Sequence, residues 1–433
     1  MQMKRKSISF TRILLACSLI LLVVFFGLLL SGHADSTGPF LIAFFICLAI
    51  GVRGFEATKG FSYTIAIFAA VAASMYYPQL FTQWGSFKLA LLITPLLQII
   101  MFGMGSQMNL NDFVGVIKMP KGVIIGVSAH YLIMPLVAFV ISHIFHFEPE
   151  VAAGIILIGC VPSGLASNVM SYIAHANLPL SVTIGAISTL LAPFITPLLM
   201  KQLAGQFIEV NVLKMMLDIL NMIILPIIAG FIFNMFYSGK ESKKSKIIQI
   251  SAYVAIIVAT SVLAMSVGVS GMSQSGALLY TLGTSLMWFC ILPALFSLVL
   301  KQILKGDRKV IESALSFLSM VGIAAIITVI TAAGRDSLLH VGALLLITSL
   351  IHNVAGYSFG YGVSWLFGMP EQDRRTVAFE VGMQNGGLAS GLANGMGKIA
   401  TVGLAPAVFG PLMNITGSIL ASNWRRKLPE ETK

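Results

Sequence analysis

Apolar runs of roughly 20 residues recur along the whole chain, and each is long enough to cross a bilayer as an α-helix. The chain is 57% hydrophobic and only 10% charged, whereas a soluble protein carries about 25% charged residues. Most of its surface therefore faces lipid, and we predict an all-α polytopic membrane protein. The expected spans are 11–31, 38–53, 61–78, 88–106, 121–145, 150–175, 178–204, 211–237, 246–268, 276–303, 309–333, 338–366, 375–396 and 399–424.

The basic residues are distributed unevenly between the two sides of these spans. With the N-terminus in the cytoplasm, about 22 of the 27 lysines and arginines fall in cytoplasmic loops and tails. This bias predicts a multi-pass protein of the cell (inner) membrane with both termini cytoplasmic. The net charge of +11 follows from the same topology, so no nucleic-acid partner is expected. All four cysteines lie inside apolar runs, which argues against a disulfide framework or a metal cluster.

The first apolar run allows two interpretations. A Lys-Arg-Lys stretch precedes it and Ser-Gly-His-Ala-Asp follows it, as in a secretory signal peptide with cleavage after Ala34. The run from Ile13 to Leu30 is longer than the apolar region of about 7–15 residues that such peptides carry. We therefore favour a retained helix, and the alternative of cleavage stays open.

Two of the spans are interrupted by glycine and small polar residues. One contains PSGLASNV at 162–169, the other contains NGGLASGL at 385–392, and both include Gly-Leu-Ala-Ser. In the order given above they are the sixth and the thirteenth spans, so they cross the membrane in opposite directions. Glycine-broken helices at matching places in two inverted halves mark the binding sites of secondary transporters. We predict that both spans unwind at these segments and face one central cavity.

The second interruption carries the residues of a cation site. Glu380 and Gln384 are four residues apart and share one helix face. They offer oxygens beside the carbonyl groups that a broken helix leaves unpaired, and hard cations take oxygen ligands. An ionisable residue inside a span is functional by default. The alternative is an ion pair between Glu380 and Arg374 or Arg375 at the cytoplasmic end of the span.

The second half of each broken helix suits an anion. Its first N–H groups have no partner within the helix, and the helix dipole places a partial positive charge there. At the second interruption these groups follow Asn385, and at the first they begin near Gly164. Ser167 and Asn168 add polar atoms to the same region. The arrangement predicts an anion held beside one or two cations.

Several motifs together resemble the bile acid:sodium symporter (BASS) family. They are MFGMGSQMNLNDF (101–113), HYLIMP (130–135), GCVPSGLASNVMSYIAHANLPLSV (159–182), IHNVAGY (351–357), FEVGMQNGGLASGLA (379–393) and MNITGSILAS (413–422). The resemblance covers about residues 60–237 and 307–425. It implies a ten-helix fold of two inverted repeats, with a core domain, a panel domain and two crossed discontinuous helices. It also implies Na⁺-coupled uptake of organic anions such as bile acids, sulfated steroids, pantoate and pyruvate.

This resemblance divides the chain into four parts. Residues 1–59 form an extra N-terminal helical pair, and 60–210 form the first inverted repeat. Residues 211–425 form the second repeat with a helical pair inserted at about 239–306, and 426–433 form a cytoplasmic tail. About four transmembrane helices are therefore additional to the family fold, in two even-numbered insertions that preserve the orientation of the family helices.

The resemblance also implies the site residues. The expected cation ligands are Glu380, Gln384, Ser167, Asn168, Ser181, His130, and the main-chain carbonyls of Val381 and Met383. The expected substrate-binding residues are Asn385, Gly386, Gly387, Gly164, Leu165, Ala166 and Asn414.

Three positions depart from the family pattern. A family threonine in one Na⁺ site is Gly185, with Thr183 nearby as a substitute, and a family glutamine in the other is His130. A third family residue, a threonine near the start of a broken half-helix, is Leu165. Imidazole is a poor Na⁺ ligand and titrates near pH 6.5, so a proton exchanged between His130 and Glu380 is an alternative to one Na⁺.

The sequence thus predicts a secondary active symporter of an organic anion, either carboxylate or sulfonate, that works by alternating access. Na⁺ is the expected coupling ion, with H⁺ in place of one Na⁺ as a variant. The rival function is a cation/proton antiporter with a similar crossed-helix fold, although such antiporters place paired aspartates at the crossing and neither interruption here contains one. No catalytic pairing is found, so an enzyme is not expected. The identity of the anion and the oligomeric state stay open.

Overall fold

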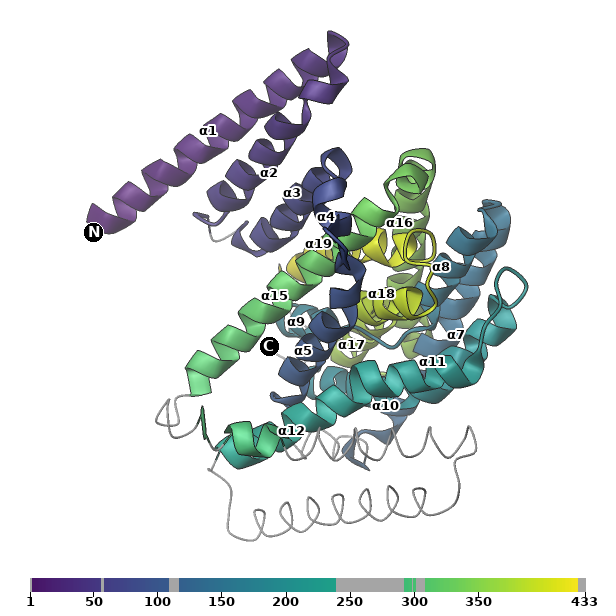
Figure 1. Ribbon diagram of the computed structural model, residues 1–433. Helices are drawn as coiled ribbons and strands as arrows, with labels where there is room; N and C mark the ends of the chain where they lie inside the picture. Colours follow the sequence, from purple (N-terminus) through teal and green to yellow (C-terminus); the bar gives the residue numbers. More distant parts are fainter. Residues whose placement is uncertain are drawn as a thin grey trace. The chain divides into compact units, whose positions relative to one another are not determined.

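The computed structural model describes residues 2–55, 58–108, 117–238, 292–297, 299–300 and 308–426, and these are predominantly helical (Figure 1). Within them, eight helices are long and apolar enough to cross a membrane, by length and composition. Three shorter apolar helices accompany them, Ser62–Tyr76, Leu89–Gly105 and Pro149–Cys160. The chain is therefore a polytopic helical membrane protein. The expected span 246–268 and most of 276–303 lie outside the described residues.

The helices follow the expected spans closely. In chain order they are α1 (Gln2–Leu30), α2 (Gly38–Val52), α3 (Ser62–Tyr76), α4 (Gln79–Thr82), α5 (Ile93–Gly105), α7 (Pro120–Ile144), α8 (Pro149–Cys160), α9 (Ala166–Ile173), α10 (Leu178–Leu203), α11 (Val212–Ile219), α12 (Leu225–Ser238), α15 (Arg308–Ala333), α16 (Arg335–Leu366), α17 (Glu371–Gly382), α18 (Gly386–Gly395) and α19 (Leu404–Arg426). A hairpin of β1 (Gln83–Trp84) and β2 (Phe87–Lys88) precedes α5.

The described chain forms two compact units. The first consists of Met1–Ile93, Asp112–Asp218 and Ile323–Lys433, and the second of Thr94–Asn111 and Ile219–Gly322. The helix that begins at Val212 passes through a π-helical turn, Leu220–Ile224, just after the boundary between these segments. All the expected site residues belong to the first unit.

At the N-terminal end of the first unit, α1 and α2 form a helical hairpin, and α2 packs against α3 (Figure 1). Small residues allow these helices to approach closely. A Cβ on Gly38 would lie 2.7 Å from the Tyr76 ring, and one on Gly51 would lie 2.8 Å from the Leu15 side chain. Thr37 and Tyr76 join their hydroxyl groups at 2.6 Å. The apolar side chains of α1 remain largely exposed, as expected for a lipid-facing helix.

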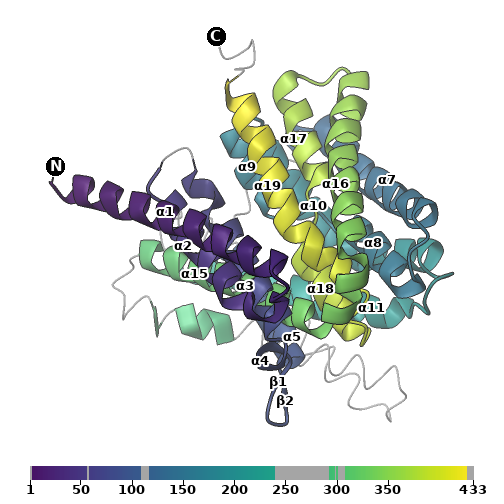
Figure 2. The ribbon, with the colours of Figure 1, turned by 90° about the horizontal axis from the view of Figure 1, so that it is seen from above.

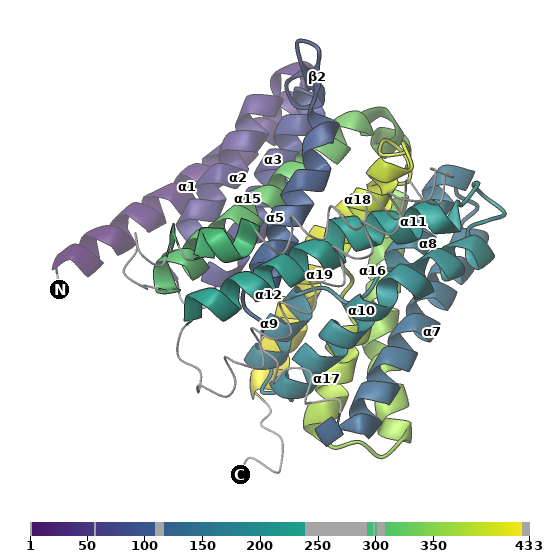
Figure 3. The same cartoon turned by 60° about the horizontal axis from the view of Figure 1, so that its bottom comes forward.

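In the first unit, α7, α10, α16 and α19 pack against the two broken helices. α16 packs against α17, α19 and α7, and Figure 2 shows α16, α17 and α19 running alongside one another. α10 packs against α7, α8 and α17 (Figure 3). Close backbone contacts again depend on glycine, because a Cβ on Gly356 would lie 2.7 Å from the Gly382 Cα, and one on Gly154 would lie 2.4 Å from the Val402 carbonyl oxygen. This tight packing fixes the positions of the breaks.

The second unit is held by close packing of α5 against α12. A Cβ on Gly105 would lie 2.1 Å from the Ile227 carbonyl oxygen, and one on Gly230 would lie 2.1 Å from the Phe102 carbonyl oxygen. Phe102 and Phe233 pack edge to face with ring centroids 5.4 Å apart. Reciprocal glycines thus let the two backbones touch, as small residues do at helix interfaces in membranes.

Candidate substrate and ion site

The first expected break lies between α8 and α9. α8 ends at Cys160, and Val161 continues in an extended conformation with φ −78° and ψ 158°. Pro162 has no N–H group and cannot continue the helical hydrogen-bond pattern. α9 then begins at Ala166, and its N-cap residue Leu165 provides no side-chain hydrogen bond to the helix. The sequence predicted that this span unwinds within 162–169, and the structure places the break between Cys160 and Ala166.

The second break lies between α17 and α18. α17 ends at Gly382, and Met383 is extended with φ −110° and ψ 115°. α18 begins at Gly386, and the Asn385 side-chain oxygen accepts a hydrogen bond from the Leu388 N–H at 3.0 Å. This is an ordinary N-cap. The second half-helix therefore has a side-chain cap, whereas α9 has none and begins with a backbone bond from the Ser167 N–H to the Gly164 carbonyl oxygen at 3.0 Å.

The two breaks are hydrogen-bonded directly to each other. The Gly164 N–H donates to the Met383 carbonyl oxygen at 3.0 Å, and the Asn385 N–H donates to the Pro162 carbonyl oxygen at 2.8 Å. These bonds form a single antiparallel bridge that pairs Ser163 with Gln384. Extended backbone at membrane depth is tolerated only where protein or a cavity satisfies its polar groups. Here each broken helix satisfies the other, so the two breaks form one structure.

The Glu380 carboxylate lies fully buried beside this bridge. Its Oε1 atom accepts hydrogen bonds from Ser167 at 2.6 Å and from Ser181 at 2.5 Å, and Oε2 accepts one from Ser163 at 2.5 Å. The Ser181 hydroxyl also lies 2.8 Å from the Asn168 side-chain oxygen. Four expected ligands, Glu380, Ser167, Ser181 and Asn168, are therefore brought together from α17, α9 and α10.

His130, on α7, is also fully buried and touches both breaks. Its Nδ1 lies 2.8 Å from the Glu380 carbonyl oxygen, and its Nε2 lies 2.9 Å from the Val161 carbonyl oxygen. A neutral imidazole has one N–H group, whereas a protonated one donates from both nitrogens. The ring contacts the main chain of Glu380, so any exchange of a proton with its carboxylate would need a further carrier.

Side chains satisfy the carbonyl groups at the end of α17. His130 contacts the Glu380 carbonyl, the Gln384 amide donates to the Val381 carbonyl at 2.8 Å, and Asn353 donates to the Gly382 carbonyl at 2.8 Å. The Met383 carbonyl accepts from the first break, as described above. Each carbonyl oxygen has two lone pairs, so Val381 and Met383 retain one each for a cation.

Gln384 leaves a buried oxygen without a partner. Its side chain is fully buried, and within the described part of the chain its Oε1 atom accepts no hydrogen bond. A buried polar atom without a partner costs about 1–3 kcal/mol. A cation bound at this oxygen would remove that penalty, which fits the expected role of Gln384.

The residues expected to bind the anion differ in exposure from the cation residues. Leu165 is exposed, and Ala166, Asn385, Gly386, Gly387 and Asn414 are partly exposed, whereas Gly164 is buried in the bridge. A Cβ on Gly386 would meet its nearest neighbour, the Pro406 carbonyl oxygen, only at 3.6 Å. The starts of α9 and α18 are thus more accessible than the carboxylate behind them.

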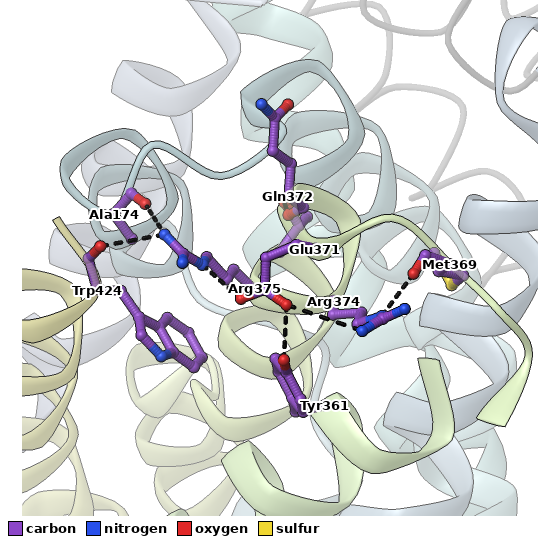
Figure 4. Close-up of polar contacts among 9 residues, drawn as sticks. Ala174, Tyr361, Met369, Glu371, Gln372, Arg374, Arg375 and Trp424 are labelled. Atoms are coloured by element: carbon purple, nitrogen blue, oxygen red, sulfur yellow. Dashed lines mark hydrogen bonds and ion pairs between the residues drawn. The ribbon is translucent and has the colours of Figure 1, made fainter. Parts of the chain in front are cut away.

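The alternative ion pair between Glu380 and Arg374 or Arg375 is wrong. Arg375 is 4% exposed and donates to Glu371 at 2.8 Å and to the carbonyl oxygens of Ala174 and Trp424 at 3.1 Å each (Figure 4). Its guanidinium also lies over the Trp424 ring, 5.7 Å from the centroid. Arg374 donates to the Met369 carbonyl oxygen (Figure 4). Both arginines therefore stabilise the end of α17 opposite to the break.

Two contributors were missed or undervalued in the sequence. Ser163 was not assigned to the site, although it donates to Glu380; the signal was its place inside the interrupted segment PSGLASNV. Asn353 lies in the motif IHNVAGY, but the motif does not identify Gly382, 29 residues later, as the residue that accepts its hydrogen bond. The substitute ligand Thr183 donates to the Pro179 carbonyl of its own helix at 2.8 Å.

Comparison with known proteins shows the family to which this chain is related. The model of the Sodium Bile acid symporter family matches residues 94–274. The uncharacterized sodium-dependent transporter YocS of Bacillus subtilis (strain 168) is 33% identical over 376 residues, which span 87% of this chain and 94% of that protein. The chain belongs to the sodium bile acid symporter family. It is therefore a membrane transport protein and not an enzyme, as the sequence predicted.

More distant members of the family are similar over most of the chain. A probable sodium/metabolite cotransporter, BASS1, of Arabidopsis thaliana chloroplasts is 29% identical over 335 residues, covering 77% of this chain and 67% of the relative. The human ileal sodium/bile acid cotransporter is 28% identical over 305 residues, covering 70% of this chain and 69% of the relative. Sodium is thus the ion named for each of these relatives.

Proposed function

We propose that this chain is a symporter that couples the entry of Na⁺ to the uptake of a small organic anion. The observation that carries the proposal is the Glu380 carboxyl group, which is fully buried and whose hydrogen-bond partners are three neutral serine hydroxyls. A charge in a membrane protein interior needs compensation. Na⁺, which its family relatives are named for, would supply it as a transported substrate.

The proposed Na⁺ ligands fall into two groups around that carboxylate. Ser167, Asn168 and Ser181 lie on the side of Oε1. Gln384 and the carbonyl groups of Val381 and Met383 lie at the end of α17, where Gln384 Oε1 has no partner in the described residues. Oxygen atoms of these kinds suit a hard cation. His130 would hold the carbonyl groups of Glu380 and Val161 in place.

The anion would bind at the starts of α9 and α18. α9 lacks a side-chain cap, so its first amide groups can donate to a carboxylate or sulfonate. Asn385, Gly386, Gly387 and Asn414 would line the same space, with Gly164, Leu165 and Ala166 at the first break. The bound Na⁺ would neutralise Glu380 and so lower the repulsion between that carboxylate and the anion.

Transport would follow an alternating-access cycle in a ten-helix fold of two inverted repeats. The pairing of the two interrupted helices supports this proposal, because each repeat of such a fold contributes one interrupted helix to the site. We also propose that both termini face the cytoplasm and that the protein resides in the cell membrane, since the basic residues favour that orientation.

Two other ways of coupling ion movement to transport can be distinguished from Na⁺ symport by experiment. In the first, a proton replaces one Na⁺, with His130 at the position of a family glutamine. In the second, the protein exchanges a cation for protons and carries no anion. Uptake of labelled anion into proteoliposomes, with Na⁺ and pH gradients imposed separately, discriminates them. Na⁺-driven uptake that is indifferent to the pH gradient supports the leading proposal. Proton-driven uptake supports the first variant, and cation exchange without anion uptake supports the second.

The anion itself can be sought by ligand-induced stabilisation. Purified protein would be screened by thermal unfolding against carboxylates and sulfonates, with and without Na⁺, in parallel with Glu380→Ala. Stabilisation by an anion that requires Na⁺ in the unmodified protein and disappears in Glu380→Ala is the expected result. An unchanged Na⁺ response in Glu380→Ala would exclude Glu380 as a ligand.

A further inference from the structure

The two oxygens of the Glu380 carboxylate have different surroundings. Oε1 accepts from Ser167 and Ser181, whereas Oε2 accepts from Ser163 at 2.5 Å. Ser163 is 4% exposed and lies in the extended segment of the first break. Within the described part of the chain, the Oε2 side of the carboxylate thus takes its hydroxyl from the break itself.

The same side of the carboxylate faces Gly185 on α10. A Cβ built on Gly185 would lie 3.6 Å from Glu380 Oε2 and 3.6 Å from Ser163 Oγ. Both distances are ordinary van der Waals contacts, so a small side chain fits there without displacing its neighbours. Position 185 is therefore placed to present an oxygen to Oε2, but glycine has none, and the hydroxyl of Ser163 lies beside it.

The pairing of the two breaks adds an independent indication. Ser163 is directly opposite Gln384 in the antiparallel bridge, and directly opposed residues project from the same face of such a pair. Gln384 Oε1 is buried and has no partner in the described residues. A hydroxyl that already donates its proton to Glu380 keeps two lone pairs for another contact. Two free acceptor sites therefore lie on one face of the bridge, next to a buried negative charge.

We propose that Ser163 is a Na⁺ ligand and that its hydroxyl replaces the oxygen that Gly185 cannot supply. The hydroxyl would donate to Glu380 and direct its lone pairs at the cation. This assignment rests on the proposed binding of Na⁺ at Glu380. It adds a ligand from the extended segment of the first break, so the geometry of the bridge and the affinity for the ion are linked.

The test moves one hydroxyl from position 163 to position 185. Full-length protein would be titrated with Na⁺ while its thermal unfolding is followed, with K⁺ added to keep the ionic strength constant. Ser163→Ala should raise the Na⁺ concentration of half-maximal stabilisation about tenfold. The double variant Ser163→Ala/Gly185→Ser should recover most of that loss. The matched control Ser163→Ala/Gly185→Ala adds the Cβ without the oxygen and should not.

Three results separate this inference from the proposed function. If Ser163→Ala binds Na⁺ as tightly as the unmodified protein while Glu380→Gln does not respond, Ser163 is not a ligand but the Na⁺ site stands. If Gly185→Ala restores affinity as well as Gly185→Ser does, the effect is one of packing and the inference fails. If the unmodified protein shows no stabilisation specific to Na⁺ over K⁺, both proposals fail. Should Ser163→Ala not fold, Gly185→Ser alone, which adds a second oxygen, is expected to lower the half-maximal concentration, and no change would overturn the inference.

Discussion

The two helix breaks share a sequence motif but differ in what they contribute to the site. The first, between α8 and α9, supplies neutral hydroxyls and starts a half-helix whose N-cap residue, Leu165, makes no side-chain cap. The second, between α17 and α18, supplies the buried charge of Glu380 and starts a half-helix capped by Asn385. The C-terminal ends of α8 and α17 are alike, because side chains of neighbouring helices donate to their carbonyl groups.

This difference supports the proposal that the second break holds the cation and the first break binds the anion. The capped start of α18 is satisfied without a ligand, so this half can hold the cation site in a fixed geometry. The start of α9 has no side-chain cap. Its Ser167 N–H donates to the Gly164 carbonyl oxygen, and an anion can accept from the amide groups that precede Ser167. His130 links the two breaks, because its ring contacts one carbonyl oxygen from each of them.

The largest expected effect follows from removing the charge that the second break alone carries. Glu380→Gln keeps the size of the side chain and removes its negative charge. Na⁺-dependent uptake into proteoliposomes should fall by about 100-fold, because a buried charged ligand contributes several kcal/mol. Glu371→Gln is the matched control, since Glu371 lies on the same helix but contacts Arg375. Equal uptake by both variants would show that Na⁺-dependent uptake does not require the charge of Glu380.

A second prediction compares how tightly the backbone is packed at the two breaks. A Cβ on Gly164 would lie 2.6 Å from the Gln384 carbonyl oxygen, whereas one on Gly386 would meet its nearest neighbour at 3.6 Å. Gly164→Ala should therefore destabilise the protein by about 1–3 kcal/mol, and Gly386→Ala should leave it nearly unchanged. Thermal unfolding in detergent measures both. Equal losses would show that the bridge is no tighter at the first break than at the second.

A smaller effect should follow from the unequal caps. Asn385→Ala removes the acceptor for the Leu388 N–H and should cost about 1 kcal/mol. Leu165→Ala removes an exposed side chain that caps nothing, so its effect on unfolding should be close to zero. In the anion screen we expect the opposite order: Leu165→Ala should change which anions stabilise the protein more than Asn385→Ala does. A large destabilisation by Leu165→Ala would contradict the uncapped start of α9.

The smallest effect is expected where the outer ends of both broken helices are joined. Glu150 lies in the first turn of α8. It forms an ion pair with Lys398 and accepts a hydrogen bond from the Thr401 hydroxyl at 2.5 Å, and both of these residues follow α18. The side chains of the ion pair are 37% and 35% exposed. Glu150→Gln should therefore change the free energy of unfolding by less than about 1 kcal/mol. A loss as large as that of Gly164→Ala would show that the outer ends also hold the breaks together.

The local features of this fold could be predicted from the sequence. The length of an apolar run determines where a helix crosses the bilayer, and within the described residues helices occupy most of each expected span apart from the two breaks. Glycines and small polar residues, with Gly164 in one segment and Gly386–Gly387 in the other, indicated the two breaks for reasons local to each segment. Glu380 was identified because a carboxylate inside an apolar run requires a partner.

The partners of that carboxylate were decided by tertiary structure. Ser163 and Ser181 reach Glu380 from positions that lie 217 and 199 residues earlier. Asn353 and His130 reach the end of α17 from α16 and α7, and neither contact has a local pattern. Such contacts depend on how helices pack, because a hydroxyl or an imidazole serves many partners equally well. The sequence thus located the carboxylate and the two breaks, and the family resemblance named Ser167, Asn168 and Ser181. Only the packing of the helices decided that Ser163 donates to Glu380 and that Asn353 donates to Gly382.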